Sequence, residues 1–190
     1  MVEKNTLRSE IKKLLESYDA EVLERWSREC FINLKKLAAF SDAGNVMLFA
    51  STYYEPDTLK IIEFLLNSGK NVFLPKIVDY CCKVMSGIKI FSVDELIPGK
   101  YGILGPAGRI AVNPAEIDFI LVPGAAFDKN NSRLGRGAGY YDRFLPQLKP
   151  ECFKTGYCFS CQVVDSVPIE PHDVKMDCVV SNIQTVLEKL

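Results

Sequence analysis

Apolar residues recur at helical spacing near the start of the chain. Leu7, Ile11, Leu14 and Leu15 lie three or four residues apart, which predicts an opening helix with one buried face. A second helix is predicted over about residues 19–38, and its apolar stripe contains Val22, Leu23, Trp26, Cys30, Phe31, Leu34 and Leu37. Both helices therefore carry a stripe suited to packing on a shared core.

Beyond these helices the pattern changes to short apolar runs of strand length. A run at 46–50 is followed by a helical pattern, which begins near Pro56 and ends at Gly69, and then by a second run at 72–75. Such a strand–helix–strand unit with short connections predicts a parallel crossover. The run at 117–123 is apolar at nearly every position, as expected for a strand buried on both faces.

The remaining segments complete an α/β pattern. Residues 84–108 contain several glycines and prolines, and we interpret them as an irregular excursion across the surface. A helix is predicted over 140–148, strands over 154–159 and 178–181, and a short helix at the C-terminus. No internal repeat is visible. We therefore expect one α/β domain over 1–190, with a mainly parallel sheet, helices on both faces and a site beyond the carboxyl ends of the strands.

Composition and charge exclude several classes of protein. The 190-residue chain is 48% hydrophobic and 25% charged, which is ordinary for a globular enzyme. Its formal net charge of -1 and its pI of about 5.9 argue against general nucleic-acid binding. The charged N-terminus and the lack of a long apolar run argue against a signal peptide and a membrane span. We expect a cytoplasmic monomer that acts on small molecules.

Seven cysteines are present, and Cys158 and Cys161 form a CxxC pair. Such a pair is compatible with redox chemistry or with half of a zinc site. However, no second CxxC follows, and the only histidine, His172, has no partner near it in the sequence. We therefore interpret the pair as small buried hydrophobic residues at a strand and its exit.

The segment 133–142 carries the clearest chemical signal. Arg133 and Arg136 are planar cationic donors suited to phosphate oxygens. The segment lacks the Gly-Lys-Ser/Thr of a Walker A loop and the spacing of a dinucleotide fingerprint. The two arginines, the two tyrosines and Asp142 together favour a nucleotide triphosphate site over a plain tight turn, an alternative that glycine spacing alone leaves open. Alternating glycines before a helix allow the backbone N–H groups to approach an anion. These glycines are Gly135, Gly137 and Gly139.

Lys4, Arg8 and Lys12 repeat every fourth residue and so share one face of the opening helix. Like charges at that spacing repel by roughly 0.2–0.5 kcal/mol per pair. Two interpretations stay open. The three residues form a solvated face, or Lys4 and Arg8 meet an anionic ligand that offsets their repulsion.

Three carboxylates are further candidates. Glu55 follows a strand end and precedes a helix, where it either interacts with the helix dipole or accepts hydrogen bonds from a ligand. Asp177 is either a turn residue or a second carboxylate beside Asp142 for Mg²⁺. Mg²⁺ usually takes one or two protein carboxylates and completes its octahedron with phosphates and waters, which suits ATP as a co-substrate.

Together these residues resemble a known family. The run 122–142, which includes Phe127-Asp128, resembles the 5-formyltetrahydrofolate cyclo-ligases, also called methenyltetrahydrofolate synthetases. The resemblance extends to Lys4 with Arg8, to Glu55 and to the block 168–177 with its His172-Asp173 pair. It implies ATP- and Mg²⁺-dependent conversion of 5-formyltetrahydrofolate to 5,10-methenyltetrahydrofolate, with release of ADP and phosphate. It also implies a three-layer α/β/α sandwich related to sugar-phosphate isomerases and CoA transferases.

The resemblance implies a set of ligand contacts. ATP would meet the start of the first helix and the Gly-rich segment, at Lys4, Asn5, Thr6, Leu7, Arg8, Arg133, Leu134, Gly135, Arg136, Gly137, Ala138, Gly139, Tyr140 and Tyr141. The folate would meet Arg8, Ala50, Glu55, Arg136, Gly137, Ala138, Gly139 and Tyr140. Asp142 and Asp177 would hold Mg²⁺. Arg136 and Tyr140 are the predicted catalytic residues, with a packing role at the helix start as the alternative for Tyr140.

One departure from the family concerns Ala138, which stands where many members have Lys or Gly. A lysine contact to the transferred phosphate is then missing, unless Arg136 supplies that charge. The implied mechanism needs no protein nucleophile, because the formyl oxygen attacks the γ-phosphate and N10 then closes the ring as phosphate leaves. Two other classes stay open, a sugar-phosphate- or CoA-handling enzyme and a folate-binding module without turnover.

Overall fold

The structure is a computed structural model of the chain, and it describes residues 3–99, 102–183 and 185–186. Its helices are α1 (Lys4–Glu16), α2 (Ala20–Leu34), α3 (Ala38–Asp42), α4 (Leu59–Asn67) and α5 (Tyr140–Phe144). Its strands are β1 (Asn45–Met47), β2 (Asn71–Asp79), β3 (Val84–Ile90), β4 (Leu96–Pro98), β5 (Leu104–Pro106), β6 (Phe119–Val122), β7 (Ala126–Asp128), β8 (Arg133–Leu134), β9 (Phe153–Tyr157), β10 (Val163–Val164), β11 (Cys178–Val180) and β12 (Thr185–Val186). Short 3₁₀ turns include η4 (Leu145–Gln147) and η5 (Ser160–Gln162).

Seven strands of the described chain form one sheet, in the order β12-β11-β9-β6-β1-β2-β3. The pairs β1–β2, β1–β6, β6–β9 and β9–β11 are parallel, whereas β3 and β12 run antiparallel at the two edges. The predicted parallel crossover from β1 through α4 to β2 is confirmed. The chain is therefore an α/β protein with a mainly parallel sheet.

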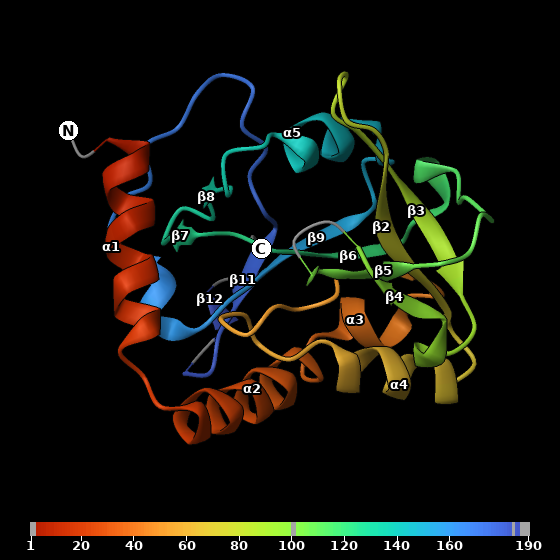
Figure 1. Cartoon of the computed structure of the whole chain (residues 1–190), viewed down its shortest axis with the longest axis horizontal. Coiled ribbons are helices and arrows are strands. Elements are labelled where there is room, and N and C mark those ends of the chain that lie inside the picture. Colours follow the sequence, from red (N-terminus) through yellow and green to blue (C-terminus); the bar gives the residue numbers. More distant parts are fainter. Residues whose placement is uncertain (1–2, 100–101, 184, 187–190) are drawn as a thin grey trace.

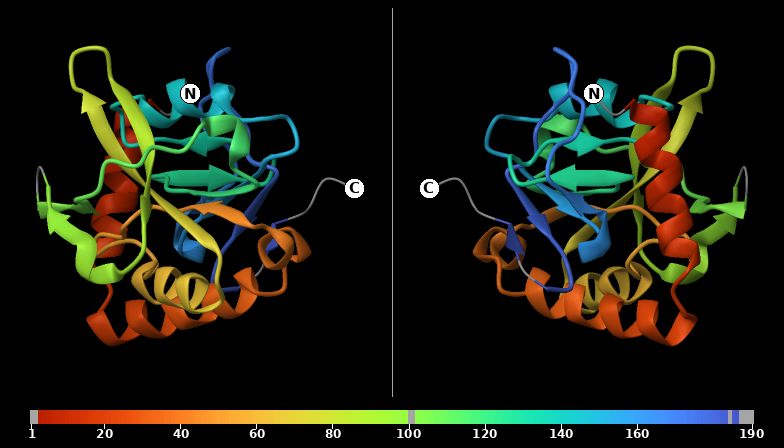
Figure 2. Two further views of the ribbon diagram at one scale, coloured as in Figure 1. Left: turned by 90° about the vertical axis from the view of Figure 1, so that its right-hand side faces the viewer. Right: turned by 90° about the vertical axis from the view of Figure 1, so that its left-hand side faces the viewer.

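The central strand β6 is buried on both faces. Phe119 and Leu121 belong to one core, which also takes in residues of α1 to α4. Ile120 and Val122 belong to a second core, together with Phe144 of α5. This alternation follows from the two-residue period of a strand and explains why the run at 117–123 is apolar at nearly every position. In Figure 1 and Figure 2, α2, α3 and α4 cover one side of the sheet and α5 lies on the other.

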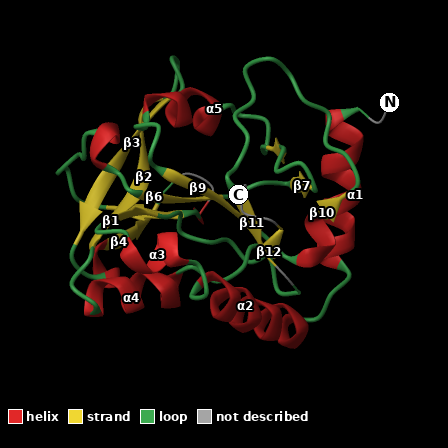
Figure 3. Ribbon diagram, turned by 180° about the vertical axis from the view of Figure 1, so that it is seen from behind, coloured by secondary structure: helices red, strands yellow, loops and turns green. Residues whose placement is uncertain are grey.

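A small three-stranded sheet and α1 lie beyond the carboxyl end of β6. The chain leaves β6 and forms β7, which pairs in parallel with β10 and antiparallel with β8. α1 lies beside β7 and β10, as Figure 3 shows from behind. It also contacts η5, and it buries Leu7, Ile11 and Leu15. The Gly-rich segment runs from β8 to α5. It therefore lies beyond the carboxyl end of β6, the position expected for the site.

The helix predicted over 19–38 is too long. α2 ends at Leu34, and Leu37 adopts extended backbone (φ -77°, ψ 121°) before α3 begins. This break allows Phe40 to enter the core, where its ring centroid lies 5.4 Å from that of Phe119. The helix predicted over 140–148 is similarly divided into α5 and the 3₁₀ turn η4.

A helix is also predicted from Pro56 onward, but α4 begins at Leu59. The Asp57 carboxylate accepts the N–H of Leu59 at 2.8 Å, and the Thr58 hydroxyl donates to the Phe49 carbonyl at 2.6 Å. These bonds hold the preceding segment as a loop, because side chains of Asp and Thr compete with helical backbone pairing. The strand predicted at 46–50 likewise ends at Met47.

The irregular excursion predicted over 84–108 is wrong in its first part. β3 is a regular strand whose register with β2 runs from Ile90 opposite Val72 to Val84 opposite Asp79, and β4 and β5 form a hairpin. The predicted C-terminal helix is absent from the residues described there, since β12 pairs with β11, while 184 and 187–190 lie outside the described residues. No helix in the described ranges is long and apolar enough to cross a membrane.

Candidate active site

The Gly-rich segment forms a turn between β8 and α5. Gly137 and Gly139 have φ values of 101° and 75°, in the left-handed region that residues with a Cβ rarely adopt. A Cβ on Gly135 would lie only 3.0 Å from a guanidinium nitrogen of Arg133. The glycines therefore allow the backbone to turn sharply while it remains close to an arginine.

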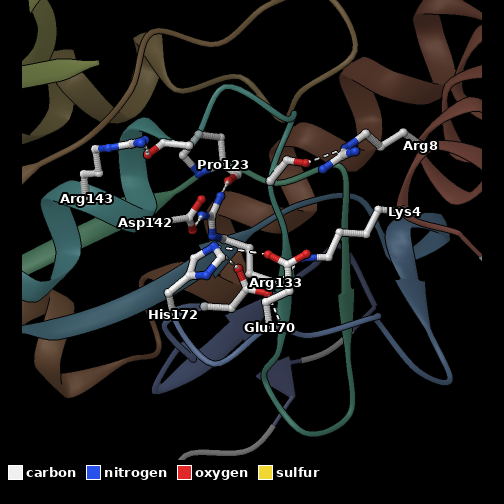
Figure 4. A network of polar contacts seen from close by, with 11 residues as sticks. Lys4, Arg8, Pro123, Arg133, Asp142, Arg143, Glu170 and His172 are labelled. Atoms are coloured by element: carbon white, nitrogen blue, oxygen red, sulfur yellow. Dashed lines mark hydrogen bonds and ion pairs between the residues drawn. The ribbon is translucent and has the colours of Figure 1, made fainter. Parts of the chain in front are cut away.

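Arg133 is buried beneath this turn, with 6% of its surface exposed. Its guanidinium pairs with the Asp142 carboxylate, donates to the Pro123 carbonyl at 3.2 Å and lies 5.6 Å from the ring centroid of Tyr141. Figure 4 shows Arg133 between Asp142 and Pro123. Its Nε has no hydrogen-bond partner within the described chain. Since buried donors are normally satisfied, this N–H is available to a ligand or to water.

The first helix brings two of the three cations on its shared face, Lys4 and Arg8, to the same place. Arg8 donates from Nε to the Gly135 carbonyl at 2.8 Å and from a terminal nitrogen to Asn5 Oδ1 at 2.7 Å. Lys4 Nζ lies 3.1 Å from Asp173 Oδ2. Lys12, by contrast, is 72% exposed and has only a distant i,i+4 partner. The solvated-face interpretation therefore fits the exposure of Lys12, whereas Arg8 contacts the Gly-rich segment and Lys4 pairs with Asp173.

These elements enclose a cavity of about 480 Å³. It is lined by cations of α1, by the Gly-rich segment and by an acidic segment near the end of the chain: Lys4, Asn5, Arg8, Arg133, Leu134, Gly135, Arg136, Gly137, Gly139, Asp142, Glu170, His172 and Asp173. Most of the predicted ATP contacts thus border one cavity. The others do not line it: Thr6 and Ala138 are exposed, Leu7 is buried in the core, and Tyr140 and Tyr141 pack against the second core.

The acidic wall of this cavity was not predicted as part of the site. Glu170 and Asp173 both lie near Lys4 Nζ, at 3.3 Å and 3.1 Å, and His172 Nε2 lies 3.3 Å from Glu170 (Figure 4). Burial alone would raise the pKa of the Asp173 carboxyl, but the Glu170 N–H, Lys4 and His172 together hold it below its ordinary value. The available signal was the His172-Asp173 pair in the block that resembles the family.

A second cavity of about 250 Å³ adjoins the first through two shared arginines, Arg8 and Arg136. Its other lining residues are mainly apolar or come from the backbone next to β6: Ile11, Lys12, Leu15, Tyr54, Gly124, Ala125 and Gln162. The buried Gln162 amide donates to the carbonyls of Gly124 and Ala125, at 3.1 Å and 3.2 Å. The second cavity therefore carries less charge than the first and has a fixed polar rim. Its lining residues other than Arg8 and Arg136 were not predicted from the sequence.

Glu55 belongs to the loop between β1 and α4, and it contacts the Gly-rich segment through Arg136. Its side chain is 6% exposed, and its Oε2 accepts both the N–H and the hydroxyl of Thr52 at 2.8 Å. Its Oε1 lies 2.7 Å from a terminal nitrogen of Arg136, whose side chain is 52% exposed. Burial raises the pKa of the Tyr141 phenol, and the Glu55 carboxylate acts in the same direction. The Tyr141 hydroxyl has no hydrogen-bond partner in the described residues.

Glu55, Asp177 and Ala50 are further predicted site residues that line neither cavity. Asp177 lies at the start of β11, where its Oδ2 accepts the N–H of Lys154 at 2.7 Å and lies 3.2 Å from the Lys154 ammonium. Ala50 is buried, with 6% of its surface exposed. Asp142 does border the first cavity. Within the described ranges, no group of three His, Cys, Asp or Glu side chains is arranged to hold a metal ion by itself.

The CxxC pair has no disulfide. Cys158 is fully buried and Cys161 is half-buried, which agrees with their interpretation as small packing residues. Burial raises the pKa of the Cys161 thiol to about 11. Thiols of this kind are weak nucleophiles near neutral pH, because little thiolate is present.

Comparison with known proteins identifies the family of this chain. Residues 1–182 match the 5-formyltetrahydrofolate cyclo-ligase family. The 5-formyltetrahydrofolate cyclo-ligase of Saccharomyces cerevisiae is 31% identical over 207 aligned residues, which cover 95% of each chain, and that of Mus musculus is 29% identical, covering 92% of this chain and 91% of the mouse protein. The solved structure of Aquifex aeolicus 5,10-methenyltetrahydrofolate synthetase has a TM-score of 0.84 and 32% identity, and covers 96% of this chain and 91% of that one. The resemblance found in the sequence is confirmed, and the chain belongs to the 5-formyltetrahydrofolate cyclo-ligase family of enzymes.

Proposed function

We propose that this enzyme uses ATP and Mg²⁺ to cyclise 5-formyltetrahydrofolate, the conversion to 5,10-methenyltetrahydrofolate that its family indicates. The observation that carries the proposal is a pair of adjoining cavities that share Arg8 and Arg136. A reaction between a phosphate donor and an organic acceptor needs two such spaces with cations at their junction. ADP and phosphate are the other products.

The larger cavity suits the nucleotide. It combines three arginines and Lys4 with the backbone of the glycine turn, which are the groups that bind phosphate oxygens most readily. Arg133 is preorganised by burial and retains one unused N–H. The predicted contacts at Thr6, Leu7, Ala138, Tyr140 and Tyr141 stay predictions, and Leu7 would contribute through its backbone because its side chain lies in the core.

The smaller cavity suits the folate. Ile11, Leu15 and Tyr54 offer apolar and aromatic surface for a pterin ring, and the backbone near Gly124 and the Gln162 side chain lie at its rim. Glu55 does not line this cavity, but it follows Tyr54 in the chain, and we propose that its carboxylate accepts N–H groups of the ring. The predicted contacts at Ala50 and Tyr140 stay predictions. Since Tyr140 packs against the core around α5, its packing role at the helix start is supported as well.

For Mg²⁺ we propose Asp142 with Asp173, in place of the predicted pair Asp142 and Asp177. All three carboxylates pair with a cation, but Asp142 and Asp173 border the same cavity, whereas Asp177 does not line it. Two carboxylates suit Mg²⁺, because phosphate oxygens and waters complete its octahedron. When bound, the ion would neutralise phosphate charge and help to orient the γ-phosphate.

The chemistry proceeds in two steps. The formyl oxygen attacks the γ-phosphorus as the bond to ADP breaks, which gives an imidate phosphate. N10 then attacks the formyl carbon and loses its proton, and the carbon–oxygen bond breaks to release phosphate. Arg136 borders both cavities, so its guanidinium is placed to neutralise charge on the moving phosphoryl group. This assigns to Arg136 the charge that a lysine at position 138 would supply.

The test is the growth of methenyl-folate absorbance when 5-formyltetrahydrofolate, Mg²⁺ and ATP are mixed with the protein. ATP consumption at full rate without the folate would refute the assignment. Arg136→Lys keeps a cation beside Glu55 but loses the planar fork of donors, so we expect kcat/KM for ATP to fall roughly 10- to 100-fold. The matched control is Arg28→Lys on the outer face of α2, whose ion pair with Glu24 is exposed and which should retain full activity.

The detailed fold class, the oligomeric state and the cellular location stay proposals. Helices on both faces of the sheet support a three-layer α/β/α sandwich related to sugar-phosphate isomerases and CoA transferases. A monomer in the cytoplasm is the form we propose for the protein. Size-exclusion chromatography with light scattering tests the first of these two points, and fractionation of cells tests the second.

A further inference from the structure

Arg136 lines both cavities, and its ion pair holds it to Glu55, which lines neither of them. We propose that this pair couples the two substrates, because Arg136 is shared between the Glu55 carboxylate and the phosphates of the nucleotide. Each substrate then strengthens the binding of the other. The inference rests on the proposed function, since it requires a nucleotide in the larger cavity and the folate in the smaller one.

The two partners differ in their freedom to move. The Glu55 side chain is 6% exposed, and its Oε2 is held by the N–H and the hydroxyl of Thr52, both at 2.8 Å. The Arg136 side chain is 52% exposed and extends from the glycine turn. The carboxylate is therefore the fixed member of the pair and the guanidinium the mobile one.

Movement of Arg136 toward a phosphate leaves Glu55 Oε1 without the partner that now lies 2.7 Å away. A buried carboxylate oxygen without a hydrogen bond is unfavourable, so a nucleotide alone binds against this loss. Tyr54, the neighbour of Glu55 in the chain, lines the smaller cavity. A ring with N–H donors in that cavity replaces Arg136 at Oε1, and the guanidinium is then free for the phosphate.

Arg8 and Lys4 are not held in this way, and Arg133, which pairs with Asp142, borders only the larger cavity. Arg8 also borders both cavities, but it donates to the Gly135 carbonyl and to Asn5 Oδ1. In these two bonds its partners are neutral, so no carboxylate loses a partner when Arg8 moves to a phosphate. Lys4 is paired with carboxylates but borders only the larger cavity. Arg136 alone among these four cations combines a buried carboxylate partner with access to both spaces. Coupling between two sites is reciprocal, so the same factor should appear in both affinities.

The experiment is isothermal titration calorimetry with a non-hydrolysable ATP analogue, Mg²⁺ and 5-formyltetrahydrofolate. Saturation with the folate should lower the Kd of the analogue by about 5- to 20-fold, and saturation with the analogue should lower the Kd of the folate by the same factor. Glu55→Gln removes the charge that holds Arg136. It should tighten binding of the analogue alone by about two- to fivefold, weaken binding of the folate and reduce the coupling factor to less than about twofold.

Glu24→Gln is the matched control, because it removes an ion pair of the same 2.7 Å length on the exposed face of α2. It should retain the coupling of the natural chain. Equal affinities with and without the second ligand, or undiminished coupling in Glu55→Gln, would overturn the inference. If Glu55→Gln is unfolded by circular dichroism, Arg136→Gln removes the same pair from its exposed side and must also abolish the coupling. Methenyl-folate production by the natural chain separates the two proposals, since turnover without coupling refutes only this one.

Discussion

The ring of Phe127 lies between two glycines, and this close packing gives a prediction with a calculable size. A Cβ on Gly124 would lie 2.6 Å from Phe127 Cζ, and a Cβ on Gly156 would lie 2.5 Å from Cε1 on the other edge of the ring. Phe127 is fully buried, so the ring has no solvent to move into. Gly156→Ala in β9 must therefore displace the ring or the strand, and overpacking of this kind costs about 1–3 kcal/mol.

Urea and thermal unfolding measure that cost. For a domain of this length it corresponds to a fall in Tm of roughly 2–12 °C. Gly105→Ala in β5 is the control, because its Cβ would meet nothing within 4 Å, and its unfolding free energy should change by less than about 0.5 kcal/mol. An unchanged urea midpoint for Gly156→Ala would refute the reasoning.

A second substitution, at Phe127, tests whether the cost of Gly156→Ala comes from its contact with this ring. Phe127→Leu removes the outer ring atoms, among them Cε1 and Cζ, which would lie 2.5 Å and 3.1 Å from a Cβ on Gly156, and it should be destabilising alone because it leaves a cavity. Combined with Gly156→Ala, it should cost less than the sum of the single changes by about 1 kcal/mol, since the added methyl occupies part of that space. Strict additivity would show that the methyl group is accommodated elsewhere.

Two further predictions concern the site and a third concerns the cysteines. Asp142→Asn should raise the Mg²⁺ concentration for half-maximal activity at least about tenfold, whereas Asp177→Asn should leave it unchanged; the opposite order would refute the proposed metal site. The lowered pKa of Asp173 means that its stabilising effect is present above the ordinary carboxyl value and is lost as the pH falls through the lower folded value. Asp173→Asn should therefore flatten the fall in Tm below about pH 4, and an unaltered profile would contradict this. At pH 8 iodoacetamide should label exposed Cys81 well before Cys161, whose pKa burial raises to about 11, and equal labelling in peptide maps would contradict the assigned burial.

Segments with strong local patterns could be predicted from the sequence. β6 and α1 are confirmed because burial on two faces, or on one helical face, leaves a regular spacing of apolar residues. The glycine turn is recognisable for a related reason, since residues at positive φ are usually glycine. Asp128, within the run that resembles the family, has a structural role, because its carboxylate accepts N–H groups of Asn130 and Ser132 in the turn before β8.

The acidic wall of the cavity could not be predicted in the same way. Asp173 and Asp177 lie four residues apart in a segment without helical or strand periodicity before β11, so spacing does not tell which carboxylate faces the site. Which carboxylate faces the cavity depends on two distant contacts. Asp177 binds Lys154 at the start of β11, and Asp173 pairs with Lys4 from the other end of the chain. Long-range pairing of this kind leaves no local pattern.

The same pairing bears on how the proposed phosphate site fits a chain with a net charge of only -1. Three cations that border the larger cavity are each held by a carboxylate: Lys4 by Asp173, Arg133 by Asp142 and Arg136 by Glu55. A phosphate must therefore compete with an internal anion for each of them, which lowers the affinity for a simple anion. A ligand that brings its own cation or N–H donors compensates the released carboxylates. Nucleotide with Mg²⁺ beside Asp142 and Asp173, and a folate ring beside Glu55, meet that requirement together, so the site should discriminate against inorganic phosphate by its own counter-charges.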